Sequence, residues 1–409
     1  MKITDGGVTA AKGYKCASMR VGIKPSGTNR DLMLLVSEVP ATCVGTFTRN
    51  KVKAAPVKWD MKIVNESKKA QAVVVNTGIA NAATGEQGLE SCKLTADAVK
   101  EVMGIEQEYV ICGSTGVIGP QLPIEKIVNG VKELSNNLSD DPVEAENAAK
   151  AIMTTDTHKK DIAVEFEVGG NTCRIGAMCK GSGMIHPNMG TMLGYIMSDV
   201  KINYDLAFST LRKIVDKTFN MVSVDGDTST NDTVIFMANG LALNNEKNDE
   251  NTDDYKNFYE ALYTVCEFLA KNIAEDGEGA TRLFTAHVTG APDYETARVL
   301  AKSIITSNLT KAAIFGKDAN CGRIFCAMGY SGAEFDPDKV DITMVSEAGS
   351  IKLIDKGMLP EFSEEEALRI LEPKEITAEC ELHMGEYEAT AWGCDLTYDY
   401  VKINADYRS

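Results

Sequence analysis

The stretch that most constrains the fold covers residues 180–199 and reads KGSGMIHPNMGTMLGYIMSD. Its first half is rich in glycine, and its second half contains an unbroken apolar run from Met192 to Met197. A short apolar run of this kind is typical of a buried strand or of a segment of a buried helix. The simplest interpretation is therefore a glycine-rich loop that leads into a buried element.

A second interpretation concerns the peptide bond between Gly190 and Thr191. A threonine hydroxyl inside a chain needs a base, but a threonine at a new N-terminus can use its own α-amine. An α-amine has a pKa of about 7.7–8.0, so a useful share of it is unprotonated near neutral pH. Gly190 has no Cβ and tolerates the strained backbone that an N-to-O acyl shift needs. These residues alone leave open both a plain loop and a self-cleaved junction with Thr191 as the nucleophile.

Length and charge narrow the classes of function. The chain has 409 residues, which is enough for two domains with large cores, and a formal net charge of −17. Surfaces that bind nucleic acid or anionic membranes need an excess of lysine and arginine, so neither is an expected partner. The sequence holds no apolar run of the roughly 18 residues that a membrane helix needs.

The cysteines and the first residues predict a reduced, cytoplasmic protein. Eleven cysteines are scattered along the chain without a CxxC pair, which is typical of buried thiols. The opening sequence, MKITDGG, lacks the apolar core of a secretory signal. Cys321 and Cys326 are the nearest pair, but the four histidines form no cluster with them in the sequence. No metal site is therefore expected.

Strand and helix patterns alternate along the chain. Short runs rich in β-forming residues predict strands, and apolar residues at helical spacing predict helices. Asp141, Pro142 and Glu144 form a typical helix start, and the acidic run 244–254 predicts a surface loop. The predicted strands are 31–39, 42–48, 71–76, 109–112, 162–168, 172–179, 283–289, 312–315 and 389–396, and the predicted helices are 89–103, 141–153, 204–218, 258–274, 294–305 and 363–371.

Polar segments follow several of these predicted elements. Residues 113–120 (GSTGVIGP) follow a buried strand, and such a turn can present backbone N–H groups and a hydroxyl to an oxyanion. Residues 154–157, 221–233 and 275–282 are similar turns, rich in hydroxyls or carboxylates. The acidic spacing of 221–233 does not fit an EF-hand, because the glycine is misplaced and the closing glutamate is missing. Taken alone, each segment also fits an ordinary turn.

Together these segments resemble the glutamate N-acetyltransferase (ornithine acetyltransferase) family of arginine biosynthesis, over essentially the whole chain. Residues 180–193 resemble the family's self-processing junction, K-G-S-G-M-I-x-P-N-M-A-T-M-L, with Gly190 where alanine is commoner. Ala319 and Cys321 depart from the family's G-x-D-P-N-W-G-R, so packing in that loop is expected to differ. Further matches are S-T-G-V-I-G at 114–119, M-T-T-D-T at 153–157, V-D-G-D-T-S-T-N-D at 224–232, G-E-G-A-T at 277–281 and V-K-I-N-A-D-Y-R-[ST] at 401–409.

The resemblance implies an α/β fold. The expected architecture is a layered αββα-type sandwich related to N-terminal-nucleophile-like enzymes, with a smaller second α/β domain. The resemblance also implies autocatalytic cleavage between Gly190 and Thr191, which would give an alpha chain of residues 1–190 and a beta chain of residues 191–409. The expected assembly is an α2β2 heterotetramer.

The implied activity is acetyl transfer by a ping-pong mechanism. Thr191 takes the acetyl group from N2-acetyl-L-ornithine, releases ornithine, and passes the acetyl group to L-glutamate. The family's oxyanion hole carries over to the hydroxyl of Thr115 and the backbone N–H of Gly116. No cofactor or metal is implied, and the sequence leaves open whether acetyl-CoA also serves as a donor. The substrate-binding positions that carry over are Thr154, Lys180, Thr191, Glu278, Asn404 and Ser409.

Lys180 and Glu278 form a complementary pair of charges. An amino-acid substrate needs one cationic and one anionic partner, and the resemblance assigns Glu278 to the amine end. Asp225, Asp227 and Asn231 are expected to support the nucleophile through hydrogen bonds, without a separate role for each. Two alternatives remain open: an N-terminal-threonine amidase or aminopeptidase that uses water as the acceptor, and a small-molecule-binding protein with an intact loop.

Overall fold

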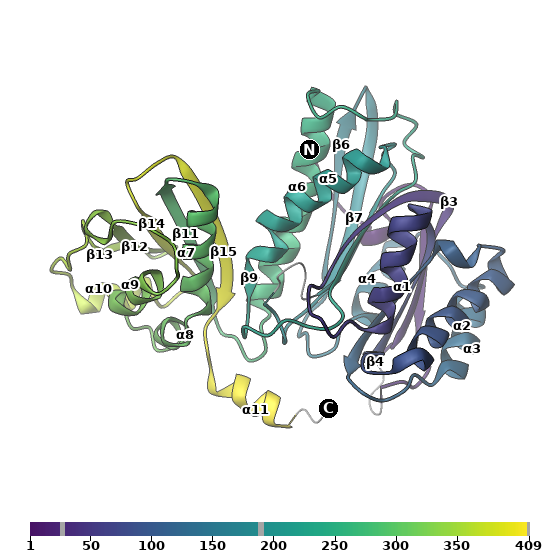
Figure 1. Cartoon of the computed structure of the whole chain (residues 1–409), viewed down its shortest axis with the longest axis horizontal. Coiled ribbons are helices and arrows are strands. Elements are labelled where there is room, and N and C mark those ends of the chain that lie inside the picture. The colour runs from purple at the N-terminus through teal and green to yellow at the C-terminus, as the bar shows by residue number, and fades with distance from the viewer. Residues whose placement is uncertain (25–28, 187–191, 407–409) are drawn as a thin grey trace.

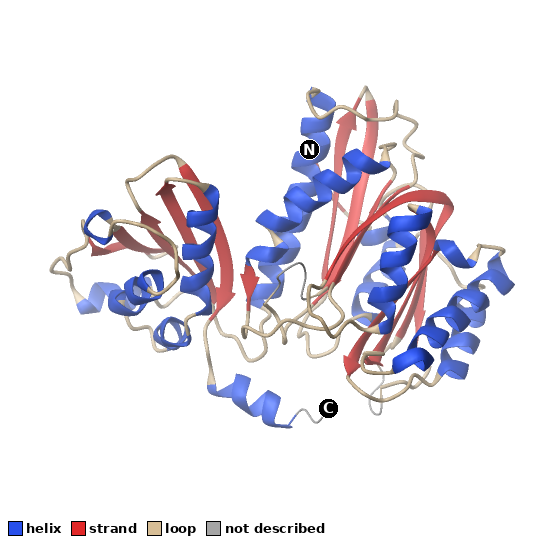
Figure 2. Ribbon diagram, viewed as in Figure 1, coloured by secondary structure: helices blue, strands red, loops and turns tan. Residues whose placement is uncertain are grey.

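Two β-sheets with helices on their faces form the molecule, as the computed structural model shows for residues 1–24, 29–186 and 192–406 (Figures 1 and 2). The larger sheet lies in the right-hand part of Figure 1 and the smaller sheet in the left-hand part. Gly190, Thr191 and Ser409 lie outside the described residues. The predicted α/β class, with a smaller second α/β unit, is confirmed.

The larger sheet is mixed. Its strands lie in the order β1 (Lys2–Thr4), β6 (Lys160–Val168), β7 (Asn171–Lys180), β8 (Leu193–Ser198), β10 (Thr233–Ala238), β3 (Leu32–Phe47), β4 (Lys69–Ile79) and β5 (Val110–Val117), and β2 (Tyr14–Met19) also pairs with β3. β8 and β10 are parallel, as are β4 and β5, whereas the other neighbours are antiparallel. The predicted hairpin of β6 and β7 is confirmed.

Both faces of the larger sheet carry helices. These are α1 (Ala55–Lys62), α2 (Gly85–Met103), α3 (Ile124–Leu134), α4 (Pro142–Ala151), α5 (Tyr204–Lys217) and α6 (Asp253–Glu275). In β3, Leu32 and Leu34 share a core with α2 and α3, whereas Met33 and Leu35 share a core with α4. Successive side chains of a strand point to opposite faces, so the continuous apolar run of β3 reflects burial on both sides.

The smaller sheet comes mainly from the C-terminal part of the chain. Its strands lie in the order β13 (Gly349–Ile354), β12 (Asp341–Ser346), β14 (Glu375–Glu381), β11 (Leu283–Ala291), β15 (Tyr387–Cys394) and β9 (Val222–Ser223). Its helices are α7 (Tyr294–Thr306), α8 (Asn308–Phe315), α9 (Cys321–Gly329) and α10 (Glu364–Ile370). Helix α6 packs on β6 and also contacts β11 and β15, so it joins the two sheets (Figure 1).

The predicted starts of two helices are confirmed. Asp141 accepts a hydrogen bond from the Val143 N–H at 2.8 Å, and Pro142 is the first residue of α4. Ser363 accepts a hydrogen bond from the Glu366 N–H at the start of α10. Each cap satisfies a backbone donor that the helix itself cannot pair.

The two strands predicted at 31–39 and 42–48 are a single long strand, β3. Its register against β4 shifts between Val36 and Ala41, and Pro40 lies in the shifted stretch. Proline has no N–H to donate to a ladder, and a bulge is one of the few places where a strand tolerates it. The apolar pattern breaks off between residues 39 and 42 because of this bulge, and in the sequence alone the break was interpreted as a strand end.

The strand predicted at 312–315 is wrong, because these residues belong to α8. Ser307 begins the helix by accepting a hydrogen bond from the Thr310 N–H. Ala313 and Ile314 are buried on the inner side of this helix. Four apolar residues fit a strand and a helix segment equally well, so the pattern could not decide between them.

A final helix, α11 (Tyr398–Asp406), follows β15. The sequence predicted a tail after the closing strand, and no helix was expected there. None of the residues of α11 is buried. Figure 1 shows this helix leaving the smaller sheet and running beneath the space between the two sheets. The remaining short turns of 3₁₀ or π helix are Gly7–Thr9, Ile63–Ser67, Gln107–Tyr109, Phe219–Met221 and Pro337–Lys339.

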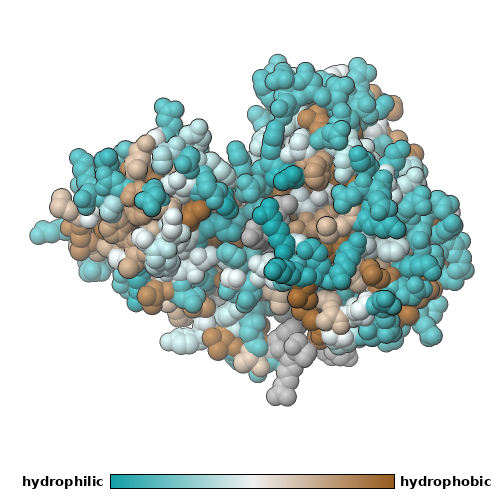
Figure 3. All heavy atoms as spheres, viewed as in Figure 1, coloured by the Kyte–Doolittle hydropathy of each residue, from teal (hydrophilic) through white to brown (hydrophobic). Residues whose placement is uncertain are grey.

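Hydrophilic side chains cover most of the face shown in Figure 3. Charged residues make up 25% of the chain, which explains this surface. Within the described ranges, no helix combines the length and the apolar character needed to cross a bilayer.

Candidate active site

The ends of β4 and β5 form one wall of a pocket. The two strands are parallel, and their register shifts at Ile79, which pairs with both Thr115 and Val117. Gly116 has a φ of +130°, and a Cβ at this position would lie 2.3 Å from the carbonyl carbon of Gly78. Only glycine allows this close approach of two backbones. The shifted register therefore requires glycine at position 116. The preceding residue, Thr115, lies on the pocket wall.

Asn231 joins this wall to the loop that precedes β10. Its Nδ2 donates to the carbonyl oxygen of Ala80 at 2.6 Å and to that of Ser114 at 2.8 Å. Its Oδ1 accepts a hydrogen bond from the Thr230 hydroxyl at 2.6 Å. Because Asn231 is buried, these bonds replace the water that the amide would otherwise bind. The side chain fixes the ends of β4 and β5 in place.

Lys180 is the last residue of β7 and is buried beside the same wall. It pairs with Leu193 at the start of β8, and its Nζ donates to Thr115 Oγ1 at 3.4 Å. Burial lowers the pKa of Lys180 below its ordinary value, whereas the neighbouring Asp156 raises it. A buried ammonium with few protein partners is well suited to bind an anionic group of a ligand.

The loop after α4 forms a second wall, to which Thr154 and Thr155 contribute. The Thr155 Oγ1 lies 2.7 Å from the Ser182 Oγ, within hydrogen-bond distance. The carboxylate of Asp156 accepts a hydrogen bond from the Gly181 N–H at 2.7 Å. These bonds tie the loop to the residues that follow β7.

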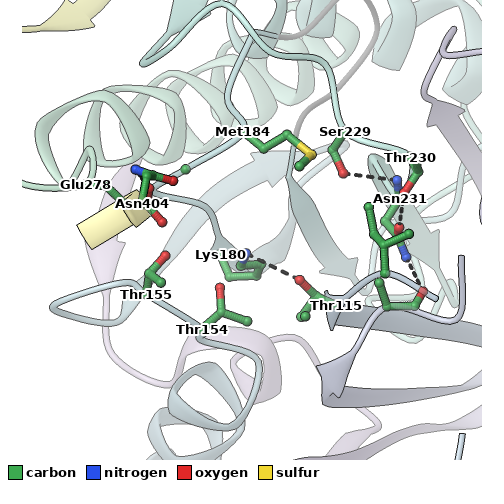
Figure 4. A pocket seen from close by; sticks show the side chains of 14 residues that line it. Thr115, Thr154, Thr155, Lys180, Met184, Ser229, Thr230, Asn231, Glu278 and Asn404 are labelled. Carbon is green, nitrogen blue, oxygen red and sulfur yellow. Dashed lines mark hydrogen bonds between the residues drawn. The ribbon is translucent and has the colours of Figure 1, made fainter. Parts of the chain in front are cut away.

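Glu278 and Asn404 lie across the pocket from Thr115 (Figure 4). The Asn404 Nδ2 donates to Glu278 Oε2 at 2.8 Å. The Glu278 N–H donates to the carbonyl oxygen of Ser182 at 2.9 Å, which anchors the turn. A Cβ on Gly183 would lie 2.3 Å from the Glu278 carboxyl carbon, so glycine there leaves room for the carboxylate.

The chain before the Gly190–Thr191 bond is anchored by Asp225. Its carboxylate accepts hydrogen bonds from the N–H groups of Met184 at 2.6 Å and Ile185 at 2.9 Å. The Asp227 N–H donates to the same carboxylate at 3.1 Å. Burial raises the pKa of Asp225 above its ordinary value, although the three backbone donors act against this rise. Asp225 thus anchors residues 184 and 185, and Asp227 contributes to this contact through its backbone.

The chain after the same bond is anchored by the larger sheet. The carbonyl oxygen of Met192 accepts a hydrogen bond from the Thr233 N–H at 2.8 Å, and β8 begins at the next residue. On the other side, the Thr228 hydroxyl donates to the carbonyl oxygen of His186 at 2.8 Å. The described residues on both sides of the bond are therefore held by the same segment, 225–233.

Six of the residues predicted from the sequence meet in this one pocket, which Figure 4 shows from close by. They are Thr115, Gly116, Thr154, Lys180, Glu278 and Asn404. Thr191 and Ser409 were also predicted, but they fall outside the described ranges. The wall also contains residues that were not individually predicted as binding residues, namely Ala80, Ile118, Thr155, Gly183, Met184, Ser229, Thr230 and Asn231. Most of them lie within the polar segments predicted from the sequence. The sequence therefore pointed to these segments, but not to the individual residues.

The pocket combines a buried cation, a carboxylate and several hydroxyls. Lys180 lies beside Thr115, and Glu278 lies on the other side (Figure 4). Within the described part of the chain, no three His, Cys, Asp or Glu side chains form a group that could hold a metal ion. The fold and the pocket define an α/β protein with a site suited to a small ligand that carries both an anionic and a cationic group.

Comparisons with known proteins identify the family. A model of the ArgJ family matches residues 15–409. The chain is 47% identical over 409 residues to the arginine biosynthesis bifunctional protein ArgJ of Caldanaerobacter subterraneus subsp. tengcongensis, and the match covers all of both chains. A crystal structure of this bifunctional protein from Bacillus halodurans is 47% identical, with a TM-score of 0.51, over 53% of this chain and 100% of that chain.

A second solved structure is ornithine acetyltransferase of Mycobacterium tuberculosis in complex with ornithine. It is 37% identical, with a TM-score of 0.42, over 45% of this chain and 96% of that chain. The family match and the full-length relative together show that the chain belongs to the ArgJ family.

Proposed function

We propose that this protein moves the acetyl group of N2-acetyl-L-ornithine to L-glutamate, with Thr191 as the acetyl carrier. As a member of the ArgJ family it is a bifunctional acetyltransferase of arginine biosynthesis. The observation that carries the assignment of the site is the pocket itself. Residues from distant parts of the sequence meet there, and a buried ammonium and a carboxylate lie on different sides.

In the first half of the proposed reaction, the Thr191 hydroxyl attacks the acetyl carbonyl of the donor. The new C–O bond forms first and gives a tetrahedral oxyanion, which collapses as the C–N bond breaks. The proton from the hydroxyl reaches the departing amine of ornithine through the α-amine of Thr191. In the second half, the amine of glutamate attacks the acetyl ester and restores the hydroxyl. The Thr115 hydroxyl and the Gly116 N–H stabilise the tetrahedral oxyanion in both halves.

The proposed charge partners divide the substrate between them. Lys180 binds the α-carboxylate, and Glu278 binds the side-chain ammonium of ornithine. Thr154, Asn404 and the C-terminal Ser409 complete the set that contacts the substrate. The burial of Lys180 supports its part, because a buried charge gains most from a partner of opposite charge.

The nucleophile is proposed to form by self-cleavage between Gly190 and Thr191. Asp225 holds the chain before this bond, and Thr233 holds the chain after it, so the strands on the two sides stay in place when the bond breaks. The products, residues 1–190 and 191–409, remain associated because β7 of the first pairs with β8 of the second.

A denaturing gel with N-terminal sequencing tests this cleavage. Freshly purified active protein should give two fragments, and the second should begin at Thr191. A single uncut band in active protein would contradict the proposal.

A transfer assay with acetyl-labelled N2-acetyl-ornithine tests the reaction. With glutamate present, label should appear in N-acetyl-glutamate. Without glutamate, label should stay on the fragment that begins with Thr191. Release of free acetate in place of acetyl-glutamate would indicate a hydrolase and would contradict the proposed transfer.

We also propose that two copies of each fragment assemble as an α2β2 heterotetramer in the cytoplasm, and that acetyl-CoA serves as a second donor. The eleven cysteines support a reducing compartment, since all of them have free thiols and nine are buried. Light scattering of the purified protein would support the assembly if it gave a mass about twice that of one chain.

A further inference from the structure

A buried cluster of charges lies beside the pocket and has no part in the proposed chemistry. The side chains of Asp156 and Lys160 are 0% exposed, and that of Asp276 is 2% exposed. The Lys160 Nζ lies 2.7 Å from Asp156 Oδ1 and 2.5 Å from Asp276 Oδ2. These three residues form the Asp156–Lys160–Asp276 triad.

Both acids of the triad bind backbone groups around the pocket. Asp156 accepts hydrogen bonds from the N–H of Gly181 at 2.7 Å and from that of Thr154 at 3.0 Å. Asp276 accepts a hydrogen bond from the N–H of Thr157 at 3.0 Å and another from the hydroxyl of the same residue. The triad therefore joins three segments: the loop after α4, the end of β7 and the end of α6.

Two of these segments carry the charged groups of the pocket. Lys180 directly precedes Gly181, and Glu278 follows Asp276 by two residues. The Glu278 N–H also donates to the carbonyl oxygen of Ser182 at 2.9 Å. The distance between the ammonium of Lys180 and the carboxylate of Glu278 thus depends on contacts made beside the pocket, and the triad supplies the buried ion pairs among them.

Lys180 lies close enough to Asp156 to lower its pKa. With Lys180 included, the cluster holds two ammoniums and two carboxylates. Burial alone would raise the pKa of Asp156, but Lys180 and Lys160 hold it well below its ordinary value. A buried ion pair that loses one partner leaves an uncompensated charge, which is strongly unfavourable. The four groups therefore resist separation.

We propose that the triad sets the spacing between the cation and the anion of the pocket, and thereby the length of the amino acid that the enzyme accepts. The inference rests on the proposed function, in which Lys180 binds the α-carboxylate and Glu278 the side-chain ammonium. N2-acetyl-lysine is one methylene longer than N2-acetyl-ornithine. One extra or missing methylene in a fitted pocket changes kcat/KM by about 10- to 200-fold, and we expect a similar scale where the two charged ends are fixed. The three residues are positioning residues, because they touch the substrate only through others.

A charge-balanced double variant tests the proposal. Lys160→Met with Asp276→Asn removes one positive and one negative charge and keeps Asp156 beside Lys180. The values of kcat/KM for N2-acetyl-ornithine and N2-acetyl-lysine are measured with glutamate as the acceptor. We expect the preference for the ornithine donor to fall by about tenfold or more, in a protein whose circular dichroism is unchanged.

The matched control is Glu165→Gln. It removes the pair between Glu165 and Arg174, which are 2.8 Å apart across the same β6–β7 hairpin and away from the pocket. The donor preference of this control should equal that of the unmodified enzyme.

An equal loss of kcat/KM for both donors would overturn the inference. It would show that the triad supports the fold without setting the length of the accepted amino acid. If the double variant does not fold, Asp276→Asn alone decides the question. Its amide oxygen can still accept from the Thr157 N–H, and Lys160 keeps Asp156 as a partner. An unmodified protein without any acetyl transfer would instead overturn the proposed function, and this inference with it.

Discussion

The two sides of the pocket are built in different ways. The side that carries Thr115 and Gly116 belongs to the larger sheet, whereas the side that carries Asn404 is the exposed helix α11. On the first side, the close approach of Gly116 to Gly78 leaves no room for a Cβ. On the second side, the contacts of the exposed helix α11 include the bond from Asn404 to Glu278 and an edge-on contact between the rings of Tyr398 and Phe315.

The difference matches the demands of the proposed chemistry. An oxyanion forms only in the transition state, so its donors must be held in place before the reaction begins. The far end of a substrate needs only to be bound, and it must also be released. We therefore expect substitutions on the sheet side to act mainly on kcat, and substitutions on the helix side to act mainly on KM.

The largest effect is expected at the reacting centre itself. Thr191→Ala should abolish both self-cleavage and acetyl transfer, because one hydroxyl performs both steps. A denaturing gel and the labelled transfer assay measure the two losses in the same preparation. Retained transfer in this variant would remove Thr191 from the mechanism.

The next largest effect is expected at the sheet side. Thr115→Ala should lower kcat by about 10²-fold or more, the usual scale for the loss of one oxyanion donor. Thr115→Ser is the matched control, because it keeps the hydroxyl and should retain most of the activity. An unchanged kcat with a raised KM would show that Thr115 binds only the ground state, and it would erase the contrast between the two sides.

A smaller and charge-specific effect is expected at Glu278. Glu278→Gln should lower kcat/KM for N2-acetyl-ornithine about ten- to hundredfold more than kcat/KM for N2-acetyl-norvaline, which lacks the side-chain ammonium. This is the scale expected because a hydrogen bond to a charged group contributes about 1.5–3 kcal/mol. Steady-state kinetics with the two donors measure the difference. The matched control is Glu275→Gln, an exposed carboxylate just before the same turn, which should not distinguish the donors. Equal losses at Glu278 would assign it a structural role.

Much of this site was predicted from the sequence, but only as separate segments. The family motifs identified Thr115, Lys180 and Glu278, and the structure brings these residues to one pocket. The place of Thr115 on the pocket wall depends on the register shift at Ile79. The hydrophobic pattern sets the register of a buried strand, but this shift lies at the ends of β4 and β5, beyond their buried apolar runs.

The parts that the sequence missed depend on long-range partners. Lys160 had no predicted role, yet it is buried beside Asp276 at the end of α6, which is distant in the sequence. The helix α8 was mistaken for a strand because its short apolar run fits both structures. Local patterns predicted the longer elements well, since these carry enough residues for a period to be visible.

The smallest effect is expected for Asn404, and it is sharpest when Asn404 is compared with Asn231. Asn404→Ala removes an exposed hydrogen bond to Glu278, so the KM for the donor should rise about two- to tenfold, while kcat and the melting temperature stay close to their original values. Asn231→Ala leaves the buried carbonyl groups of Ala80 and Ser114 without this donor and should reduce the free energy of unfolding by about 1–3 kcal/mol. Thermal melting and steady-state kinetics on both variants test the contrast. If Asn404→Ala lowered the melting temperature as much as Asn231→Ala, α11 would be part of the rigid frame, and the two sides of the pocket would be equally fixed.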